Sequence, residues 1–156
     1  MKSMVDINVI LNDRYVEPKV TIHARERSLQ VERIIEAIEN ASENDFPAIP
    51  ASRGSSIELL SQRDIIRAYT DSRKVMIQTS DGLYTCGRTL SDLEGMLNPE
   101  RFVRISQSEI TNLYKVSAFD FDRAGTIGIT YENGEISWVS RSRVRQIKSI
   151  LKSQNK

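Results

Sequence analysis

The last two thirds of this sequence break into short strand-like runs, and this pattern constrains the fold more than any other feature. From residue 57 onward, β-branched and aromatic residues recur in short runs with polar turn residues between them, which is typical of strands joined by tight turns. The clearest turn is Asn133-Gly134, because Asn-Gly between alternating residues favours a two-residue hairpin. We predict strands at residues 57–60, 65–69, 74–79, 83–88, 102–105, 113–119, 126–131 and 135–139. The sequence therefore predicts a mainly β fold.

Short helical segments lie between and after these runs. Residues 89–97 predict a capped helix, since Leu90, Leu93 and Leu97 fall on one face. Residues 108–112 are interpreted as one turn of helix, and residues 142–152 as a closing helix. The fold class is therefore α+β with β structure dominant.

The first 56 residues have a different pattern. Residues 4–11 and 19–24 predict two short strands, and Ser28 is a candidate N-cap for a helix over residues 29–40. Residues 41–56 (ASENDFPAIPASRGSS) have the composition of a linker. We therefore divide the chain into a strand–strand–helix head with its linker, residues 1–56, and a second domain, residues 57–156.

The predicted head is too small to bury a core alone. Its helix carries one apolar stripe, formed by Val31, Ile34, Ile35 and Ile38. This stripe must pack on the second domain or on another copy of the chain. We predict that residues 1–56 mediate homodimerisation, with an intramolecular cap over one sheet as the alternative.

Positive charge is concentrated at the C-terminus. Residues 140–156 hold six cations and no Asp or Glu, although the whole chain has a net charge of only +1. Residues 1–56 carry seven basic and nine acidic side chains. A cationic edge on a balanced protein is typical of a polyanion binder. Two alternatives are a solvated helix whose cations suit its C-terminus, and a module whose basic tail binds an acidic, regulatory partner protein.

The composition argues against several other classes. One cysteine, Cys86, and one histidine, His23, leave no intramolecular disulfide, Cys-based zinc cluster or His-rich metal site. No apolar run approaches the roughly 20 residues that cross a bilayer, and the polar N-terminus does not resemble a signal peptide. The sequence also contains no catalytic or Gly-rich phosphate motif. We expect a cytoplasmic protein that is not an enzyme and has no cofactor, metal or membrane span.

Several motifs occur in a recognisable order. Residues 81–84 read DGLY, residues 89–94 read TLSDLE, residues 102–113 read FVRISQSEITNL, and residues 140–142 read SRS. In these motifs, residues 57–152 resemble the LytTR-type DNA-binding domain, a bacterial transcription-factor module. The resemblance implies antiparallel β-sheets with short helices, and binding to double-stranded DNA. Family response regulators carry a phospho-receiver domain before this module, and 56 residues are too few for one, so we expect a stand-alone regulator.

The sequence departs from the family pattern at two places. Ser106 and Gln107 replace the His-Arg or His-Lys pair of many members. Gln still offers a donor and an acceptor to a base edge, but the base preference of relatives cannot be transferred. Thr111 stands where Val is frequent, and we interpret this change as neutral.

The resemblance further implies that three loops enter the DNA grooves. In the first loop we expect contacts from Ser72, Arg73 and Lys74, with an ordinary polar turn as the alternative. In the second, Gln107 is the preferred base-reading residue. Further candidates in the second loop are Arg104, Ser106 and Ser108.

Each second-loop candidate has a structural alternative. Ser108 is also a candidate helix cap, and Asn112 is interpreted as a turn-closing residue. Arg104 is expected to face away from the core and to contact phosphate or pair with an acid.

The third loop is the start of the closing helix. Ser140 is predicted to cap this helix, whose free N–H groups would face a phosphate. Arg141 and Arg143 are preferred over Arg145 as contacts, because an Arg fork engages guanine with two hydrogen bonds.

The remaining aromatic residues and the cysteine are assigned to the interior. We expect Phe119, Phe121, Tyr131 and Trp138 to build the core and not to stack on bases, and Cys86 to act as a small hydrophobe inside the sheet.

Overall fold

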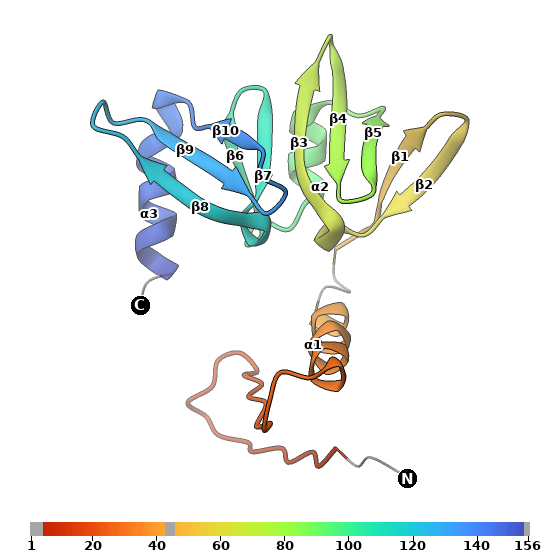
Figure 1. Ribbon diagram of the computed structural model, residues 1–156, viewed down its shortest axis with the longest axis vertical. Coiled ribbons are helices and arrows are strands. Elements are labelled where there is room, and N and C mark those ends of the chain that lie inside the picture. Colours follow the sequence, from red (N-terminus) through yellow and green to blue (C-terminus); the bar gives the residue numbers. More distant parts are fainter. Residues whose placement is uncertain (1–4, 43–45, 155–156) are drawn as a thin grey trace. The chain divides into compact units, whose positions relative to one another are not determined.

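The computed structural model describes residues 5–42 and 46–154. The chain divides into two units, residues 1–43 and residues 44–156, and each is treated by itself (Figure 1).

The first unit contains one helix, α1 (Leu29–Ser42), after a segment, residues 5–28, that forms neither helix nor strand. The predicted strands at residues 5–11 and 19–24 are therefore wrong, and Met4 lies outside the described residues. An isolated pair of strands is marginal in water, and no sheet is available in this unit to complete one. The cap prediction is confirmed, because the Ser28 hydroxyl accepts from the Val31 N–H at 3.3 Å. The stripe of α1 is half-buried, whereas Leu11 and Val16 are 90% and 97% exposed.

The second unit is built from two antiparallel sheets. The larger has the strand order β2-β1-β5-β4-β3-β7-β6 and the smaller β10-β9-β8. The strands are β1 (Ile49–Arg53), β2 (Ser56–Leu60), β3 (Ile65–Asp71), β4 (Lys74–Thr79), β5 (Gly82–Cys86), β6 (Phe102–Ser106), β7 (Glu109–Asn112), β8 (Val116–Phe121), β9 (Ile127–Tyr131) and β10 (Ile136–Trp138). The helices are α2 (Leu90–Met96) and α3 (Val144–Gln154), with 3-10 turns η1 (Gln62–Asp64), η2 (Leu113–Lys115) and η3 (Arg141–Arg143). The predicted fold class is confirmed.

Strand β1 lies inside the segment that we interpreted as a linker. It pairs with β2 from Ile49 opposite Leu60 to Arg53 opposite Ser56, around a turn in which Gly54 has φ +62°. Ile49 and Ala51 are almost completely buried. The linker prediction is therefore wrong for this stretch, because pairing with β2 and β5 outweighs the weak strand preference of its Pro, Ala and Ser residues.

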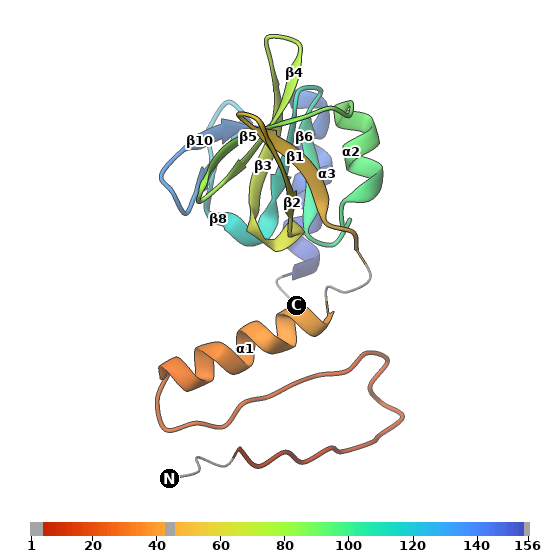
Figure 2. The ribbon, with the colours of Figure 1, turned by 90° about the vertical axis from the view of Figure 1, so that its right-hand side faces the viewer.

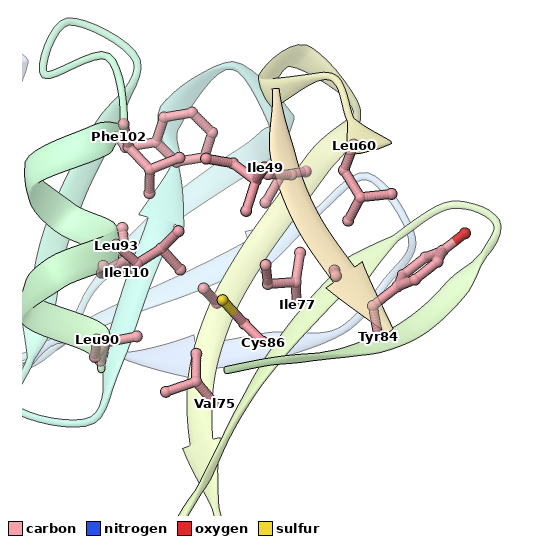
Figure 3. Close-up of a cluster of buried hydrophobic side chains, with 14 residues drawn as sticks. Ile49, Leu60, Val75, Ile77, Tyr84, Cys86, Leu90, Leu93, Phe102 and Ile110 are labelled. Carbon is pink, nitrogen blue, oxygen red and sulfur yellow. The ribbon is translucent and has the colours of Figure 1, made fainter. Parts of the chain in front are cut away.

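One face of the large sheet packs on α2 (Figure 3). Ile77 and Ile110 of the sheet and Leu93 of α2 belong to the same buried cluster. Helix α2 begins as predicted, since the Thr89 hydroxyl accepts from the Asp92 N–H at 3.1 Å. Cys86 belongs to this core and is 5% exposed, which confirms its assignment as a small buried hydrophobe.

A second core is formed by residues of β3 and β6 in the large sheet, of the small sheet and of α3. Its members are Ile66, Val103, Ile105, Ile127, Ile129, Tyr131, Val139 and Ile147. Tyr131 is 1% exposed as expected, but Trp138 and Phe121 are 60% and 57% exposed, so their assignment to the core is wrong. Side chains alternate along a strand, and Ser137 on β10 and Val139 just after it take the inward positions.

Residues 108–112 form a strand and not the expected turn of helix. From Glu109 to Asn112 they make β7, which pairs with β3 and β6. Asn112 closes the next turn, as predicted: its buried side chain donates to the Ile65 carbonyl at 2.7 Å and accepts from the Tyr114 N–H at 3.0 Å. Because this turn is η2, β8 begins three residues later than the predicted strand at residues 113–119.

Candidate nucleic-acid interface

Three segments that carry the predicted DNA-binding residues lie at the same end of the second unit. They are the β3–β4 turn, the β6–β7 turn and the stretch between β10 and α3, which lie toward the top of Figures 1 and 2. Backbone hydrogen bonds connect them: the Thr70 N–H donates to the Ser108 carbonyl at 2.9 Å, and the Ser140 N–H donates to the Ile105 carbonyl at 2.8 Å. The second segment thus holds the first and the third in place.

The β3–β4 turn has an unfavourable backbone conformation. Asp71 pairs with Lys74, so Ser72 and Arg73 are the two turn residues, and their φ values are +48° and +68°. Left-handed conformations cost side-chain-bearing residues about 1–2 kcal/mol each. Asn-Gly would fill this turn at lower cost, and strained positions that retain their side chains occur most often at functional sites. Ser72, Arg73 and Lys74 are all exposed.

The β6–β7 turn is short and polar. Ser106 pairs with Glu109, which leaves Gln107 and Ser108 exposed at the tip. The Ser106 hydroxyl accepts from the Ser108 N–H at 3.2 Å and lies 3.3 Å from the Ser108 hydroxyl. Ser108 therefore belongs to a hairpin turn and caps no helix.

Arg104 does not face away from the core as expected. It stands two residues after the buried Phe102 and therefore shares its face of the sheet, next to α2. Its Nη1 lies 2.8 Å from Glu94 Oε2 and its Nε donates to the Ser106 carbonyl at 2.8 Å. A second guanidinium N–H donates to the Gln107 carbonyl, and the side chain is only 10% exposed. Of the two roles left open by the sequence, the structure shows the ion pair with an acid.

The third segment begins with a 3-10 turn and not with the helix. Turn η3 precedes α3, which starts at Val144, so Ser140 does not cap the helix as predicted. Its hydroxyl lies 3.3 Å from that of Ser142 and makes no cap hydrogen bond. The Ser140 N–H donates to the Ile105 carbonyl of β6.

Helix α3 continues the third segment with a row of cations. A shallow groove along it is lined by Arg141, Arg145, Lys148 and Lys152, together with Val144 and Ser149. The four cations are spaced four, three and four residues apart, which places them on one helical face. The opposite side is buried through Ile147. We call these four residues the α3 cation row; Arg143 is half-buried and lies outside it, and Lys156 lies outside the described residues.

One important residue was missed from the sequence. Arg67, on β3, is 17% exposed and forms ion pairs with Glu109 and Glu135. Burial alone would lower the pKa of Arg67, but its hydrogen bond to Glu109 and the charges of both carboxylates raise that pKa above its ordinary value. The partners lie 42 and 68 residues away in the sequence, so no local pattern could have identified them.

A buried tyrosine lies beside Arg67. The Tyr131 hydroxyl is 2.7 Å from that of Thr111, and burial, with the charge of Glu109, raises the pKa of Tyr131 to about 12. Thr111, which we interpreted as a neutral departure from the family's Val, provides this hydrogen bond.

The described residues contain no group of three or more His, Cys, Asp or Glu side chains placed to hold a metal ion. No helix among them is long and apolar enough to cross a bilayer.

Comparison with known proteins gives consistent matches. The sequence profile of the LytTr DNA-binding domain family matches residues 55–152. The chain is 26% identical over 148 residues to uncharacterized HTH-type transcriptional regulators of Staphylococcus aureus strains MSSA476 and MW2, and the match covers 95% of this chain and 99% of theirs. Although these relatives are described as HTH-type, five strands separate α1 from α2, and five more separate α2 from α3, in the part of the chain that the structure describes.

A solved structure shows the same fold. It is the LytTr DNA-binding domain of a Bacillus cereus protein described as a methyl-accepting/DNA response regulator. The TM-score is 0.65 with 19% sequence identity, and the match covers 67% of this chain and 96% of that one.

Proposed function

The chain belongs to the LytTr DNA-binding domain family, whose profile covers residues 55–152, and we propose that it is a sequence-specific transcriptional regulator that binds double-stranded DNA. The observation that carries this proposal is the grouping of three polar turns at one end of the domain, connected by backbone hydrogen bonds. The regulators of Staphylococcus aureus that match nearly the whole chain support the regulatory role. DNA binding in a bacterium would place the protein in the cytoplasm.

The residues divide into two kinds of contact. Gln107, at an exposed hairpin tip, has the donor and acceptor needed at a base edge. Arg73 and Lys74, with the α3 cation row, have the charge needed at phosphates. Arg141 begins that row beside the turns and is the best candidate for a guanine contact. Arg104, bound to Glu94 and to two carbonyls of the second turn, would act by holding Gln107 in place and not by touching DNA.

Binding assays over a range of salt concentrations test this function. The probe is a duplex selected from a random pool by the protein itself, compared with a scrambled duplex of equal composition. Six exposed cations lie in the turns and the α3 cation row, and each phosphate neutralised contributes about −0.9 to the slope of log K against log salt. We expect a slope approaching about −5 if all six engage, and tighter binding to the selected duplex. A slope near zero, or equal affinity for both duplexes, would refute sequence-specific binding.

The alternative function is binding of an acidic partner protein through the α3 cation row. The absence of Asp and Glu from residues 140–156 favours any polyanion equally. A polyglutamate chain at the same charge concentration distinguishes the two. If it displaced the selected duplex as well as unlabelled duplex does, the alternative would be favoured.

We further propose that the N-terminal unit mediates homodimerisation. Residues 5–28 expose many apolar side chains, among them Ile7, Val9 and Val16, and exposed apolar surface of this kind marks interaction sites. Light scattering on the full chain and on a chain lacking residues 1–43 tests this proposal. A cut at residue 57 is unsuitable because it removes β1. Monomeric full-length protein at micromolar concentration, or a truncated chain that still dimerises, would exclude this role.

A further inference from the structure

A single guanidinium group connects the strands that carry all three DNA-facing segments. Arg67 lies on β3, which leads to the first turn. Its Nη1 donates to Glu109 Oε1 at 2.9 Å on β7, which follows the second turn, and to Ser137 Oγ at 3.1 Å on β10, which leads to the third segment. Its Nη2 pairs with Glu135, just before β10. The contacts join the large sheet to the small one.

The partners of Arg67 also hold one another. Gln78, opposite Arg67 on β4, accepts from its Nε at 2.6 Å and donates to Glu135 Oε1 at 2.9 Å. The Ser137 hydroxyl donates to Glu109 Oε1 at 2.7 Å. All three guanidinium nitrogens are therefore engaged in a fixed planar geometry, which is the arrangement that arginine provides and lysine does not. We call Arg67, Gln78, Glu109, Glu135 and Ser137 the Arg67 cluster.

The charge of the Arg67 cluster argues against direct DNA contact. It contains one cation and two carboxylates, so its net charge is negative and would repel a phosphate. Half-buried ion pairs of this kind often contribute little to stability compared with apolar residues of equal volume. A polar cluster that spans two sheets is better explained by the geometry that it imposes.

We propose that Arg67 is a positioning residue for base recognition, because it sets the spacing of the three DNA-facing segments. This inference rests on the proposed function. Hydrogen bonds to base edges weaken steeply when distance or angle changes, whereas attraction to phosphates is long-ranged and tolerant of small shifts. Loosening the Arg67 cluster should therefore reduce sequence preference and leave general DNA affinity intact.

The test compares Arg67→Met with a matched control, Arg53→Met. Arg53 lies on β1 of the same sheet, pairs with Glu58 at 3.5 Å and stacks over Tyr84 at 4.7 Å, but contacts none of the three segments. Fluorescence anisotropy measures Kd for the duplex selected by the wild-type protein and for the scrambled duplex. For Arg67→Met we expect the ratio of the two affinities to fall at least tenfold, with the scrambled Kd within twofold and the salt slope unchanged. Arg53→Met should keep the wild-type ratio, and Arg67→Lys should not restore it.

Each outcome decides between distinct explanations. A folded Arg67→Met protein with the wild-type ratio would overturn the inference and leave the proposed function standing. Equal weakening toward both duplexes would also overturn it, since that result indicates only a lower folded fraction. A wild-type protein without preference would overturn the proposed function and the inference together. If Arg67→Met fails to fold, Glu135→Gln is tested by the same ratio of affinities. Glu135 is 44% exposed and the replacement keeps the side-chain volume, so this variant should fold. We expect the ratio to fall threefold.

Discussion

Replacement of Asn112 should destabilise the DNA-binding domain by an amount that follows from two buried hydrogen bonds. Its side chain is fully buried, donates to the Ile65 carbonyl at 2.7 Å and accepts from the Tyr114 N–H at 3.0 Å. Each such bond contributes about 1 kcal/mol net, and a buried polar group that loses its partner costs about 1–3 kcal/mol. For Asn112→Ala we therefore expect the free energy of unfolding to fall by about 2–4 kcal/mol. Asn112→Asp should cost more, because a carboxylate oxygen would then face the Ile65 carbonyl.

Urea denaturation followed by the fluorescence of Trp138, the single tryptophan, measures these losses at constant m. Asn133→Ala is the control, since Asn133 is exposed and accepts one hydrogen bond, from the Glu135 N–H at 3.0 Å; it should cost less than about 1 kcal/mol. A loss below about 1 kcal/mol for Asn112→Ala, or a milder effect of Asp than of Ala, would refute the reasoning. Weakened DNA binding by a fully folded Asn112→Ala protein would instead show that Asn112 acts on DNA.

Three further predictions follow from the described contacts. The folded-state pKa of Tyr131 is raised from 10.0 to about 12, so the stability that the protonated hydroxyl gives the fold is complete below pH 10 and is lost as pH rises toward 12. The free energy of unfolding should fall by about 2–3 kcal/mol over this range. Tyr131→Phe should lack this decline in urea titrations at alkaline pH, and an identical decline would contradict the assignment. Ser72→Asn combined with Arg73→Gly should relieve the backbone strain of the β3–β4 turn and stabilise the domain by about 1 kcal/mol. The same double variant should bind DNA more weakly, and undiminished affinity would exclude this turn from the interface. Arg141→Ala should cost about 1–3 kcal/mol toward the selected duplex, whereas Lys152→Ala should weaken both duplexes slightly and equally; equal small losses for both variants would indicate only a diffuse cationic surface.

Strand β4 was predictable because its own side chains alternate. In β4, Val75, Ile77 and Thr79 are buried and the residues between them are not, and the strand matches its predicted bounds. The same reasoning failed at β1, where Pro50, Ala51 and Ser52 give no apolar alternation and the neighbouring strands stabilise the strand. It also failed at residues 5–11, which have the pattern of a strand but no sheet in their unit to join.

Helix starts were predictable to the extent that they depend on local hydrogen bonds. Ser28 and Thr89 accept from N–H groups three residues later, which is a relation within one turn of chain. Ser140 is likewise a hydroxyl residue just before a predicted helix, yet its side chain makes no cap hydrogen bond. Its N–H donates to the carbonyl of Ile105, 35 residues earlier, and the 3-10 turn η3 stands between it and α3. The residue type alone therefore did not locate the start of this helix.

In the candidate site, too, some features depend on neighbouring residues in the sequence and others on distant ones. The turns could be located from the sequence, because turn residues and hairpin spacing are local properties. Whether each cation is exposed or paired with a carboxylate could not be predicted, because this depends on which acidic side chains the fold brings near it. Arg104 belongs to the family motif but is bound to Glu94 on α2, and Arg67, which was given no role from the sequence, contacts strands next to all three segments. The sequence thus left open whether Arg104 contacts phosphate or pairs with an acid, and it gave no sign that Arg67 is paired with two carboxylates. In this structure the paired arginines are distinguished from the exposed cations by their carboxylate neighbours, and those neighbours are set by contacts between segments that are separated in the sequence.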